Sequence, residues 1–339
     1  MNTQISILTV LIASAFTAVT ALAQTTDFYA GKTISLIIGS GEAGGYDMGG
    51  RLMARYLKTY IPGNPTILPR NMPGASSVVA AEYLYNVAPR DGLTLGTVQP
   101  GIVLNKSLDP KAKYLPERFS WIGRIQPATL IGIGWTAAGL NTLEDAQKRE
   151  FAVSASGAAG LAAIVPWALN KMAGTRLKVI RGYESVRPQF VAMERGEVMG
   201  IGSVSLADAL ARPEWLRDHL MSLLYTIALK RVKYAPDTPA IVELASGPLD
   251  REVMAMLGSS TDIGQMLMAP PDVPGDRVAI LRKAFDAMIA DPDFVEEAEK
   301  LGIFVEPLKG AELTAMVSAA SAASPEALAR LREVAQPPD

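Results

Sequence analysis

Short apolar runs alternate with segments of helical periodicity along this chain. Residues 33–38 form the first apolar run, and the segment after its loop repeats apolar residues at every fourth position, at Met48, Leu52, Tyr56 and Tyr60. Further strands are expected at residues 66–68, 93–98, 121–125, 130–135, 151–154, 177–180 and 225–230, and further helices at residues 77–85, 161–173, 186–195, 278–290 and 292–300. Strands that alternate with helices predict a parallel sheet with both faces covered, so the expected fold class is α/β.

Three of the expected strands are followed by a glycine-containing loop and a helix start. The loops cover residues 39–47, 70–77 and 155–160. Glycine lets the backbone turn sharply and brings several N–H groups together. A helix start adds unpaired N–H groups and a partial positive charge. This arrangement is typical of a site that binds an anion.

The length of 339 residues suggests two domains. We expect residues 24–122 and 232–339 to form one domain and residues 123–231 to form the other. Ligands bind beyond the carboxyl ends of the strands in open parallel sheets, and both expected domains carry a glycine loop there. The sequence therefore predicts a ligand cleft between two domains, with helix starts contributed from both sides.

Composition removes several classes of function. A net charge of −2 gives no support for nucleic-acid binding. The absence of cysteine excludes disulfides and thiolate metal sites. His219 is the only histidine, which removes the usual general base and most transition-metal chemistry, and residues 215–220 around it have the pattern of a helix segment. We assign no catalytic residue, no metal site and no cofactor, and we expect a protein that is not an enzyme.

The first 23 residues have the features of a secretory signal. Residues 5–21 are apolar or small and almost uncharged, and they lead into Ala21-Leu22-Ala23, the small-x-small pattern of a cleavage site. An uncleaved membrane anchor is the alternative, but the run is short and rich in Ala, Ser and Thr. We expect cleavage after Ala23, a mature start at Gln24 and export to the periplasm.

The first loop matches a dinucleotide fingerprint. Gly39, Gly41 and Gly44 have its spacing, between a strand and a helix as that motif requires. The acidic residue expected about 20 residues further on is missing, although Arg70 near that place could contact a 2′-phosphate. Two points count against this interpretation. Export takes the protein away from the cytoplasmic nicotinamide cofactors, and a dinucleotide does not explain the glycine loop at residues 154–160. An NADP-dependent reductase is therefore only an alternative.

Two acidic residues of the first loop have more than one interpretation. Asp47 opens the helix, where a carboxylate either caps the backbone, which is worth about 1 kcal/mol, or contacts a hydroxyl or amine of a ligand. The carboxylate of Glu42 would repel an anion unless it points to solvent or pairs with a cation. The charge of Glu42 therefore weakens the prediction of an anion site.

The second half of the chain offers candidates of the same kind. Ser154, Ser156 and Gly157 could hold an anionic group through hydroxyl and N–H groups, or could simply form a tight turn. The recurrence of the strand, loop and helix start favours the binding role. Tyr183, beside Gly182, either lines the cleft or packs at the surface.

Several motifs, in order along nearly all of the mature chain, resemble signatures of the Bug family, the extracytoplasmic substrate-binding proteins of tripartite tricarboxylate transporters. They are Gly44-Gly45-Tyr46-Asp47, Ile61-Pro62-Gly63-Asn64-Pro65, Asn71-Met72-Pro73-Gly74-Ala75, Ala88-Pro89-Arg90-Asp91-Gly92, Gly182-Tyr183, Glu194-Arg195-Gly196-Glu197-Val198, Ala269-Pro270-Pro271-Asp272-Val273-Pro274, Leu281-Arg282-Lys283-Ala284-Phe285 and Asp291-Pro292-Asp293-Phe294. The chain departs from the family pattern at residues 40–43, at Met199 and at residues 264–267.

The resemblance implies a type II periplasmic-binding-protein fold, with two α/β domains joined by crossing strands that close around a small carboxylate. It also implies partners, one small and one large integral membrane protein. From the loops and the resemblance together, the candidate ligand-binding residues are Ser40, Gly41, Gly44, Gly45, Tyr46, Asp47, Gly74, Ala75, Ser76, Ser154, Ser156, Gly157, Ala158, Tyr183 and Ser203.

The sequence thus predicts an exported, monomeric solute-binding protein that captures a small organic anion and delivers it to a membrane transporter. A ligand-sensing input of a signalling system with the same fold is the second hypothesis, and the reductase is the third. The sequence does not identify the ligand.

Overall fold

The computed structural model describes residues 28–42, 45–109, 111–157, 160–183 and 186–337. The predicted signal sequence, with cleavage after Ala23, lies outside these residues, as do the candidate residues Gly44 and Ala158. The chain divides into two compact units. Unit 1 contains the described residues up to Gln99, then Lys113–Ile125 and Met266–Thr314, and unit 2 contains Pro100–Ala112, Gln126–Gln265 and the residues from Ala315 onward.

Unit 1 is built on a six-stranded sheet with the order β11-β4-β10-β3-β1-β2. Its strands are β1 (Thr33–Ile38), β2 (Thr66–Asn71), β3 (Thr94–Thr97), β4 (Ser120–Gln126), β10 (Gln265–Ala269) and β11 (Leu308–Lys309). Strand β1 is parallel to β2 and β3, whereas β10 is antiparallel to β3 and β11 is antiparallel to β4. Its helices are α2 (Gly45–Tyr60), α3 (Val78–Asn86), α11 (Gly275–Ile289), α12 (Pro292–Lys300) and the start of α13 (Gly310–Ser321), with short 3-10 helices at Ala75–Ser77 and Pro116–Arg118.

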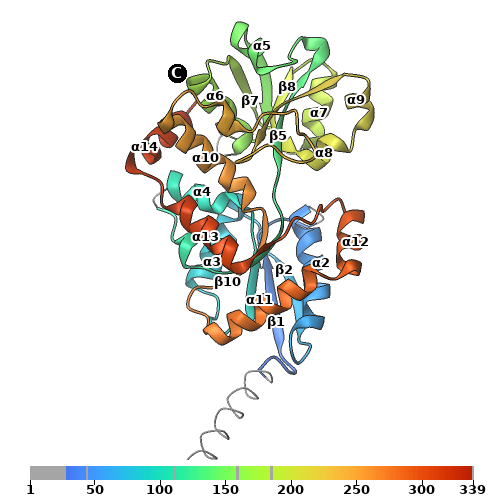
Figure 1. Cartoon of the computed structure of the whole chain (residues 1–339), viewed down its shortest axis with the longest axis vertical. Helices are drawn as coiled ribbons and strands as arrows, with labels where there is room; N and C mark the ends of the chain where they lie inside the picture. Colours follow the sequence, from blue (N-terminus) through green and yellow to red (C-terminus); the bar gives the residue numbers. More distant parts are fainter. Residues whose placement is uncertain (1–27, 43–44, 110, 158–159, 184–185, 338–339) are drawn as a thin grey trace, which may run out of the picture. The chain divides into compact units, whose positions relative to one another are not determined.

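The core of unit 1 joins this sheet to helices α2 and α11 (Figure 1). Strand β1 contributes Ile34, Leu36 and Ile38, and these three side chains are almost completely buried. Helix α2 packs closely on the sheet because it carries glycine at the contact: a Cβ atom on Gly50 would lie 3.0 Å from Ile38 Cδ1 and 3.1 Å from Thr97 Cγ2. The close packing fixes where α2 begins relative to the ends of β1 and β3.

Unit 2 is built on a five-stranded sheet with the order β7-β6-β8-β5-β9. Its strands are β5 (Leu130–Trp135), β6 (Phe151–Ala155), β7 (Leu177–Arg181), β8 (Gly200–Ser205) and β9 (Met221–Ile227). Strand β6 is parallel to β7 and β8, and β5 is antiparallel to β8 and β9. Its helices are α4 (Gly101–Leu108), α5 (Leu143–Lys148), α6 (Leu161–Met172), α7 (Val186–Glu194), α8 (Leu206–Leu210), α9 (Pro213–Arg217), α10 (Pro248–Asp262) and α14 (Pro325–Val334), with 3-10 helices at Thr136–Ala138 and Ile241–Leu244.

Two hydrophobic clusters form the core of unit 2. One joins β6 and β9 to helices α4, α6, α10 and α14, and the other joins β5 and β8 to α7, α8 and α9. Leu130 packs against the first cluster and the adjacent Ile131 belongs to the second. Because neighbouring side chains of a strand point to opposite faces, the two clusters cover opposite faces of the sheet.

The boundaries of the two units differ from the expected domains. Helices α4, α10 and α14 fall in unit 2, although the sequence places them in the same domain as β1. The reason is their apolar side chains: Leu104, Leu257 and Leu331 are buried in the cluster that contains Phe151 of β6. Each unit therefore combines segments that are far apart in the sequence.

The expected fold class, α/β with several strand–loop–helix units, agrees with the structure, but the sheets are mixed rather than wholly parallel. His219 does not lie in a helix as expected. It follows the end of α9 with φ at +53°, and its carbonyl accepts a hydrogen bond from the Thr136 hydroxyl. The left-handed backbone at this position ends the helix.

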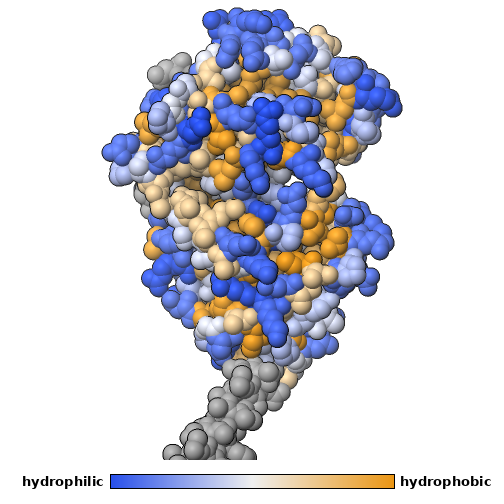
Figure 2. Space-filling view, viewed as in Figure 1, coloured by the Kyte–Doolittle hydropathy of each residue, from blue (hydrophilic) through white to orange (hydrophobic). Residues whose placement is uncertain are grey.

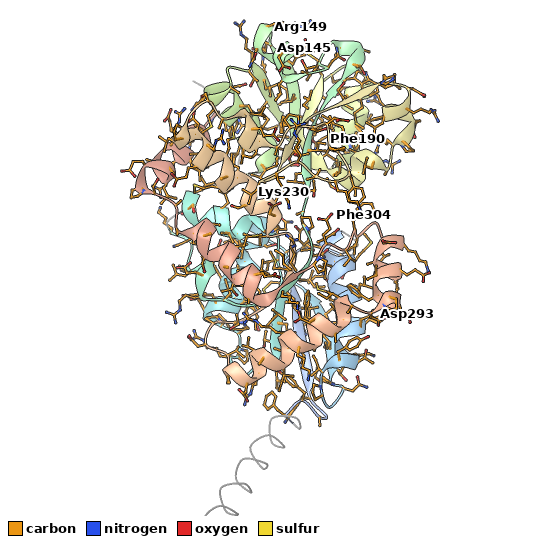
Figure 3. The ribbon with its side chains drawn as sticks, in the orientation of Figure 1. Asp145, Arg149, Phe190, Lys230, Asp293 and Phe304 are labelled. Carbon is orange, nitrogen blue, oxygen red and sulfur yellow. The ribbon has the colours of Figure 1, made fainter. Side chains whose placement is uncertain are left out.

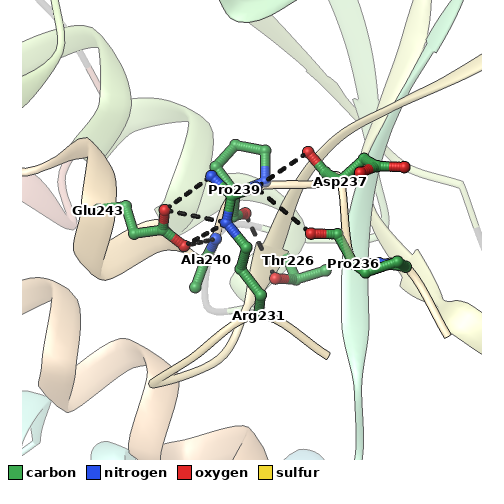
Figure 4. A network of polar contacts seen from close by, with 7 residues as sticks. All are labelled: Thr226, Arg231, Pro236, Asp237, Pro239, Ala240 and Glu243. Atoms are coloured by element: carbon green, nitrogen blue, oxygen red, sulfur yellow. Dashed lines mark hydrogen bonds and ion pairs between the residues drawn. The ribbon is translucent and has the colours of Figure 1, made fainter. Parts of the chain in front are cut away.

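An ion pair holds the segment that leaves β9. Arg231 donates from Nη2 to Glu243 Oε2 at 2.9 Å and from Nε to both oxygens at 3.1 Å (Figure 4). Glu243 also accepts from the Ala240 N–H at 3.0 Å, and the Thr226 N–H donates to the Pro239 carbonyl at 2.8 Å. This network fixes a proline-containing connection within unit 2.

Hydrophilic residues predominate on the face drawn in Figure 2, with smaller hydrophobic patches between them. Among the residues that the structure describes, we find no helix with the length and apolar character needed to span a membrane.

Candidate functional site

The first candidate loop links the end of β1 to the start of α2. Its entry is fixed by the sheet, since the Gly39 N–H donates to the Thr97 carbonyl at 2.9 Å. Gly41 and Glu42 are exposed, and Gly45 and Tyr46 are the first two residues of α2. Tyr46 is half-buried, and burial raises the pKa of its hydroxyl above the ordinary value. The loop thus presents backbone at the beginning of a 16-residue helix.

Asp47 is the third residue of α2 rather than its N-cap, so the capping interpretation does not hold as stated. The residue is 4% exposed. Its carboxylate accepts from Arg51 Nε at 2.9 Å and from Asn71 Nδ2 at 2.8 Å. Arg51 in turn donates to Asn71 Oδ1 at 2.7 Å. These contacts tie α2 to the end of β2, and they give Asp47 a structural role.

Glu42 is exposed, so its carboxylate is not enclosed in the loop. The hydrogen bond to Asp47 raises the pKa of Arg51, and the negative charge of Glu42 adds to this effect. The exposure of Glu42 to solvent weakens the objection that this residue would repel an anionic ligand.

The second candidate loop runs from β2 into α3 and has a left-handed backbone at three residues. The φ angles are +142° at Gly74, +45° at Ala75 and +73° at Ser77. Ala75 is exposed, and Ser76 lies between it and Ser77 in the 3-10 helix. Positive φ is uncommon for residues other than glycine and is concentrated at functional sites. Ser77, which the sequence did not single out, is fully buried and contacts the first loop.

Two hydroxyl groups at this end of the unit 1 sheet have no hydrogen-bond partner. The Ser40 Oγ and the Thr97 Oγ1 are both buried atoms, and neither is paired with any residue that the structure describes. No acceptor for the N–H groups of Ser40 and Gly41 is found among the described residues. Unpaired buried polar groups are costly, so the hydroxyl groups of Ser40 and Thr97 point to a polar partner such as a bound anion or water.

In the loop after β6 of unit 2, the two candidate serine residues differ in their surroundings. Ser154 is fully buried, and its Oγ donates to Gln189 Oε1 at 3.0 Å. Ser156 is exposed and Gly157 is half-buried. A Cβ atom on Gly157 would meet nothing within 4 Å. Ser156 and Gly157 therefore remain candidates for ligand contact, whereas the Ser154 hydroxyl faces the interior of unit 2.

Tyr183 lines a hollow of about 560 Å³ along helix α7, together with Arg187, Pro188, Val191, Ala192, Arg195 and Glu197. It is joined to the loop after β6 by its neighbour, because the Gly182 N–H donates to the Ser156 carbonyl at 3.3 Å. Tyr183 also packs against the cluster around Phe190, which lies inside unit 2 (Figure 3). The hollow lies along α7 within unit 2, and the position of Tyr183 in a ligand cleft stays a prediction.

Two cations near this loop were not identified from the sequence. Arg181 ends β7 and Arg187 belongs to the first turn of α7, and both are exposed. Within the described ranges, neither guanidinium has an ion-pair or hydrogen-bond partner. The only signal in the sequence was their position on either side of Gly182-Tyr183. Both could pair with a carboxylate group.

The last candidate, Ser203, lies in the middle of β8 and is half-buried. Among the described residues, no group of three or more acidic or histidine side chains could hold a metal ion.

No family model matches the chain. A UPF0065 protein of Bordetella bronchiseptica is 24% identical over 294 residues, which is 84% of this chain and 81% of that protein.

Solved structures with the same fold cover nearly the whole chain. A TctC solute-binding protein from Polaromonas, solved without ligand, has a TM-score of 0.68 at 18% identity, over 90% of this chain and 98% of its own. MatC from Rhodopseudomonas palustris, with bound malate, has a TM-score of 0.63 at 19% identity, over 90% and 99%. The periplasmic binding protein BugD has a TM-score of 0.63 at 19% identity, over 90% and 98%.

These similarities confirm the resemblance to the Bug family and the two-domain fold of periplasmic solute-binding proteins. The Polaromonas protein and BugD are both binding proteins.

Proposed function

We propose that this protein binds a small carboxylate outside the cytoplasm and delivers it to a membrane transporter of the tripartite tricarboxylate type. The observation that carries the proposal is the set of hydrogen-bond donors in the first loop. It combines the buried, unpartnered hydroxyl of Ser40 with the N–H groups of Ser40 and Gly41, which lack acceptors among the described residues, next to the beginning of α2. An anion accepts hydrogen bonds from all of these donors and interacts favourably with the helix start.

A carboxylate fits this loop better than a neutral ligand. Hydrogen bonds to a charged group are stronger than neutral ones, and the exposed Arg187, which lines a hollow with Tyr183, has no ion-pair partner among the described residues. The malate bound to MatC shows a carboxylate ligand in a protein with the same fold. Capture is proposed to occur by closure of the two domains over the ligand, with the mature protein acting as a periplasmic monomer.

The first experiment is thermal unfolding of the protein that starts at Gln24, in the presence of mono-, di- and tricarboxylates, aromatic acids, amino acids and NADP. A ligand at about 100 times its Kd stabilises the folded state by about 2.7 kcal/mol, which gives a clear increase in Tm. An increase with carboxylates supports the proposal. An increase with NADP alone would instead support the reductase, and no increase with any carboxylate contradicts carboxylate binding.

A matched pair of variants tests whether the first loop holds the ligand. Ser40→Ala removes a hydroxyl that has no partner among the described residues, so the ligand-free protein should keep its stability. Its affinity for the carboxylate should fall by about tenfold or more, since a hydrogen bond to a charged group contributes roughly 1.5–3 kcal/mol. Ser318→Ala, at an exposed position of α13, is the control and should change neither quantity.

Closure and partnership need their own measurements. Small-angle X-ray scattering should show a smaller radius of gyration when a confirmed ligand is added, and an unchanged radius would contradict closure. Transporter genes next to the gene for this protein would support transport, whereas a neighbouring sensor kinase gene would favour the sensing alternative.

A further inference from the structure

The carbonyl group of Gly39 is held from inside unit 1 by Ser77. The Ser77 hydroxyl donates to the Gly39 carbonyl at 2.7 Å and accepts from the Gln99 N–H at 3.0 Å. Ser77 is fully buried. One side chain thereby joins three segments: the loop after β1, the segment after β3, and its own loop after β2.

The next carbonyl along the first loop is held in the same way. Asn71 Nδ2 donates to the Ser40 carbonyl at 3.0 Å and to Asp47 Oδ1 at 2.8 Å. Asn71 Oδ1 accepts from Arg51 Nη2 at 2.7 Å. Two successive carbonyl groups, of Gly39 and Ser40, are thus fixed by side chains that come from the loop and strand next to them.

Fixing a carbonyl group also fixes the N–H group of the following residue. The peptide bonds here are trans, and in a planar trans peptide the C=O and the next N–H point in opposite directions. The N–H groups of Ser40 and Gly41 must therefore point away from Ser77 and Asn71. These are the two N–H groups that lack acceptors among the described residues.

The positive φ angle of Ser77 indicates that its hydroxyl is needed at this position. Its φ angle of +73° is one that glycine adopts without strain and that other residues rarely adopt. A serine at this position accepts the strain and supplies the hydroxyl that holds Gly39. Gly39 in turn has no room for a side chain, because a Cβ atom there would lie 2.6 Å from Ser77 Oγ.

We propose that Ser77 and Asn71 are positioning residues, which orient the N–H groups of Ser40 and Gly41 for a carboxylate before the ligand arrives. The inference rests on the proposed function, because it assigns a role within the same site. Neither side chain needs to touch the ligand. Orientation in advance removes part of the entropic cost of binding, since the loop does not have to be ordered when the ligand binds.

The test compares Ser77→Ala with Ser77→Gly. Both variants lose the hydroxyl, but only glycine relieves the positive φ angle, so Ser77→Gly should be the more stable of the two. If the hydroxyl positions the loop, both variants should bind malate at least tenfold more weakly, regardless of their difference in stability. Ser260→Ala is the control, because it also removes a buried serine hydroxyl, which bonds to Leu257 within α10 of unit 2.

A second readout does not depend on any ligand. Backbone ¹⁵N relaxation of the ligand-free protein should give order parameters near 0.85 for Ser40 and Gly41, and values below about 0.6 in both Ser77 variants and in Asn71→Ala. Unchanged order parameters would overturn the inference. The inference would also be overturned if the malate affinity of each variant changed in step with its stability, so that Ser77→Gly bound malate nearly as well as the wild type.

The outcomes separate this inference from the proposed function. If the wild-type protein binds no member of the carboxylate panel, carboxylate binding fails and the positioning role fails with it, whatever the order parameters are. If the wild type binds malate and the Ser77 variants bind it equally well, the proposed function stands and the positioning role fails. If malate is not a ligand but another member of the panel is, that acid replaces malate in the same comparison.

Discussion

The hydroxyl of Ser154 donates a hydrogen bond of 3.0 Å to Oε1 of Gln189, and both residues are buried. This contact joins β6 to α7 inside unit 2. Ser154→Ala should therefore lower the free energy of unfolding by about 1–3 kcal/mol, because it removes a buried hydrogen bond between β6 and α7. Ligand affinity should not change.

Urea denaturation and calorimetric titration measure the two quantities. Ser156→Ala is the matched control in the same loop, because Ser156 is exposed and its loss should leave stability unchanged. A Ser154→Ala protein of wild-type stability with weakened ligand binding would show that the hydroxyl serves the ligand after all.

The carboxylate of Asp47 should be more important for stability than for charge recognition. Asp47→Ala removes the acceptor for Arg51 and Asn71, and we expect a loss of about 2 kcal/mol in the free energy of unfolding. Arg51→Gln should cost less, because Arg51 is half exposed. Chemical denaturation of both variants checks this order, and the reverse order would contradict the structural role of Asp47.

Stability at low pH should depend on the contact between Tyr56 and Glu297. The Tyr56 hydroxyl donates to Glu297 Oε2 at 2.8 Å. This bond holds the pKa of Glu297 below its ordinary value of 4.5, and it raises the pKa of Tyr56 to about 12. A carboxyl group with a lowered pKa stabilises the folded state above its unfolded pKa, and this contribution is lost as the pH falls through the folded pKa. A tyrosine with a raised pKa loses its contribution as the pH rises from 10 toward 12.

Tyr56→Phe should therefore be less stable than the wild type at neutral pH, and the difference should shrink below pH 4.5 and above pH 10. Thermal unfolding across this pH range measures the difference. Tyr85→Phe is the control, because no hydrogen bond to its hydroxyl is found among the described residues. A constant difference at all pH values would exclude the pKa linkage.

Arg187 should contribute to the attraction of an anionic ligand. Because the guanidinium is exposed, Arg187→Gln should weaken carboxylate binding by no more than about fivefold, in line with the 0.2–1 kcal/mol typical of exposed ion pairs. The loss should be smaller at high salt. Titrations at low and high ionic strength test this, with Arg251→Gln on α10 as the control. Equal losses in both variants would indicate a general effect of net charge.

Local patterns predicted most of the strands but not which side of a helix is buried. The expected strands at residues 33–38 and 130–135 have the observed bounds, as does the helix at residues 292–300. In α2, however, Met48 is 37% exposed, whereas Gly49 and Gly50 are buried. Hydrophobic periodicity does not count glycine, although glycine is what allows this helix to approach the sheet closely.

The assignment of segments to units depends on tertiary contacts that a linear pattern does not contain. Helix α10 was not predicted, and it joins unit 2 because Val253, Met254 and Leu257 pack with residues around Phe151. Unit 2 continues to Gln265, past the domain boundary that the sequence predicts near residue 232. The resemblance predicted the fold class but not this division.

The loops of the candidate site were located from glycine and serine composition, but the role of each side chain was not. Ser40 was identified, and its hydroxyl is unpartnered as a ligand contact requires. Ser77 was missed, because one buried serine with a left-handed backbone has no sequence pattern of its own. The sequence also does not reveal that Ser154 faces Gln189, since the two residues are 35 positions apart.

The division of each unit among distant segments has a consequence for biosynthesis. Strand β10 lies between β3 and β4 in the unit 1 sheet, although it follows β4 by more than one hundred residues. At roughly 5–20 residues per second, the ribosome adds β10 on the order of ten seconds after β4. Until then the two halves of this sheet have no strand to connect them. Unit 1 therefore cannot reach its native form early in translation, which suits a polypeptide that is proposed to be exported.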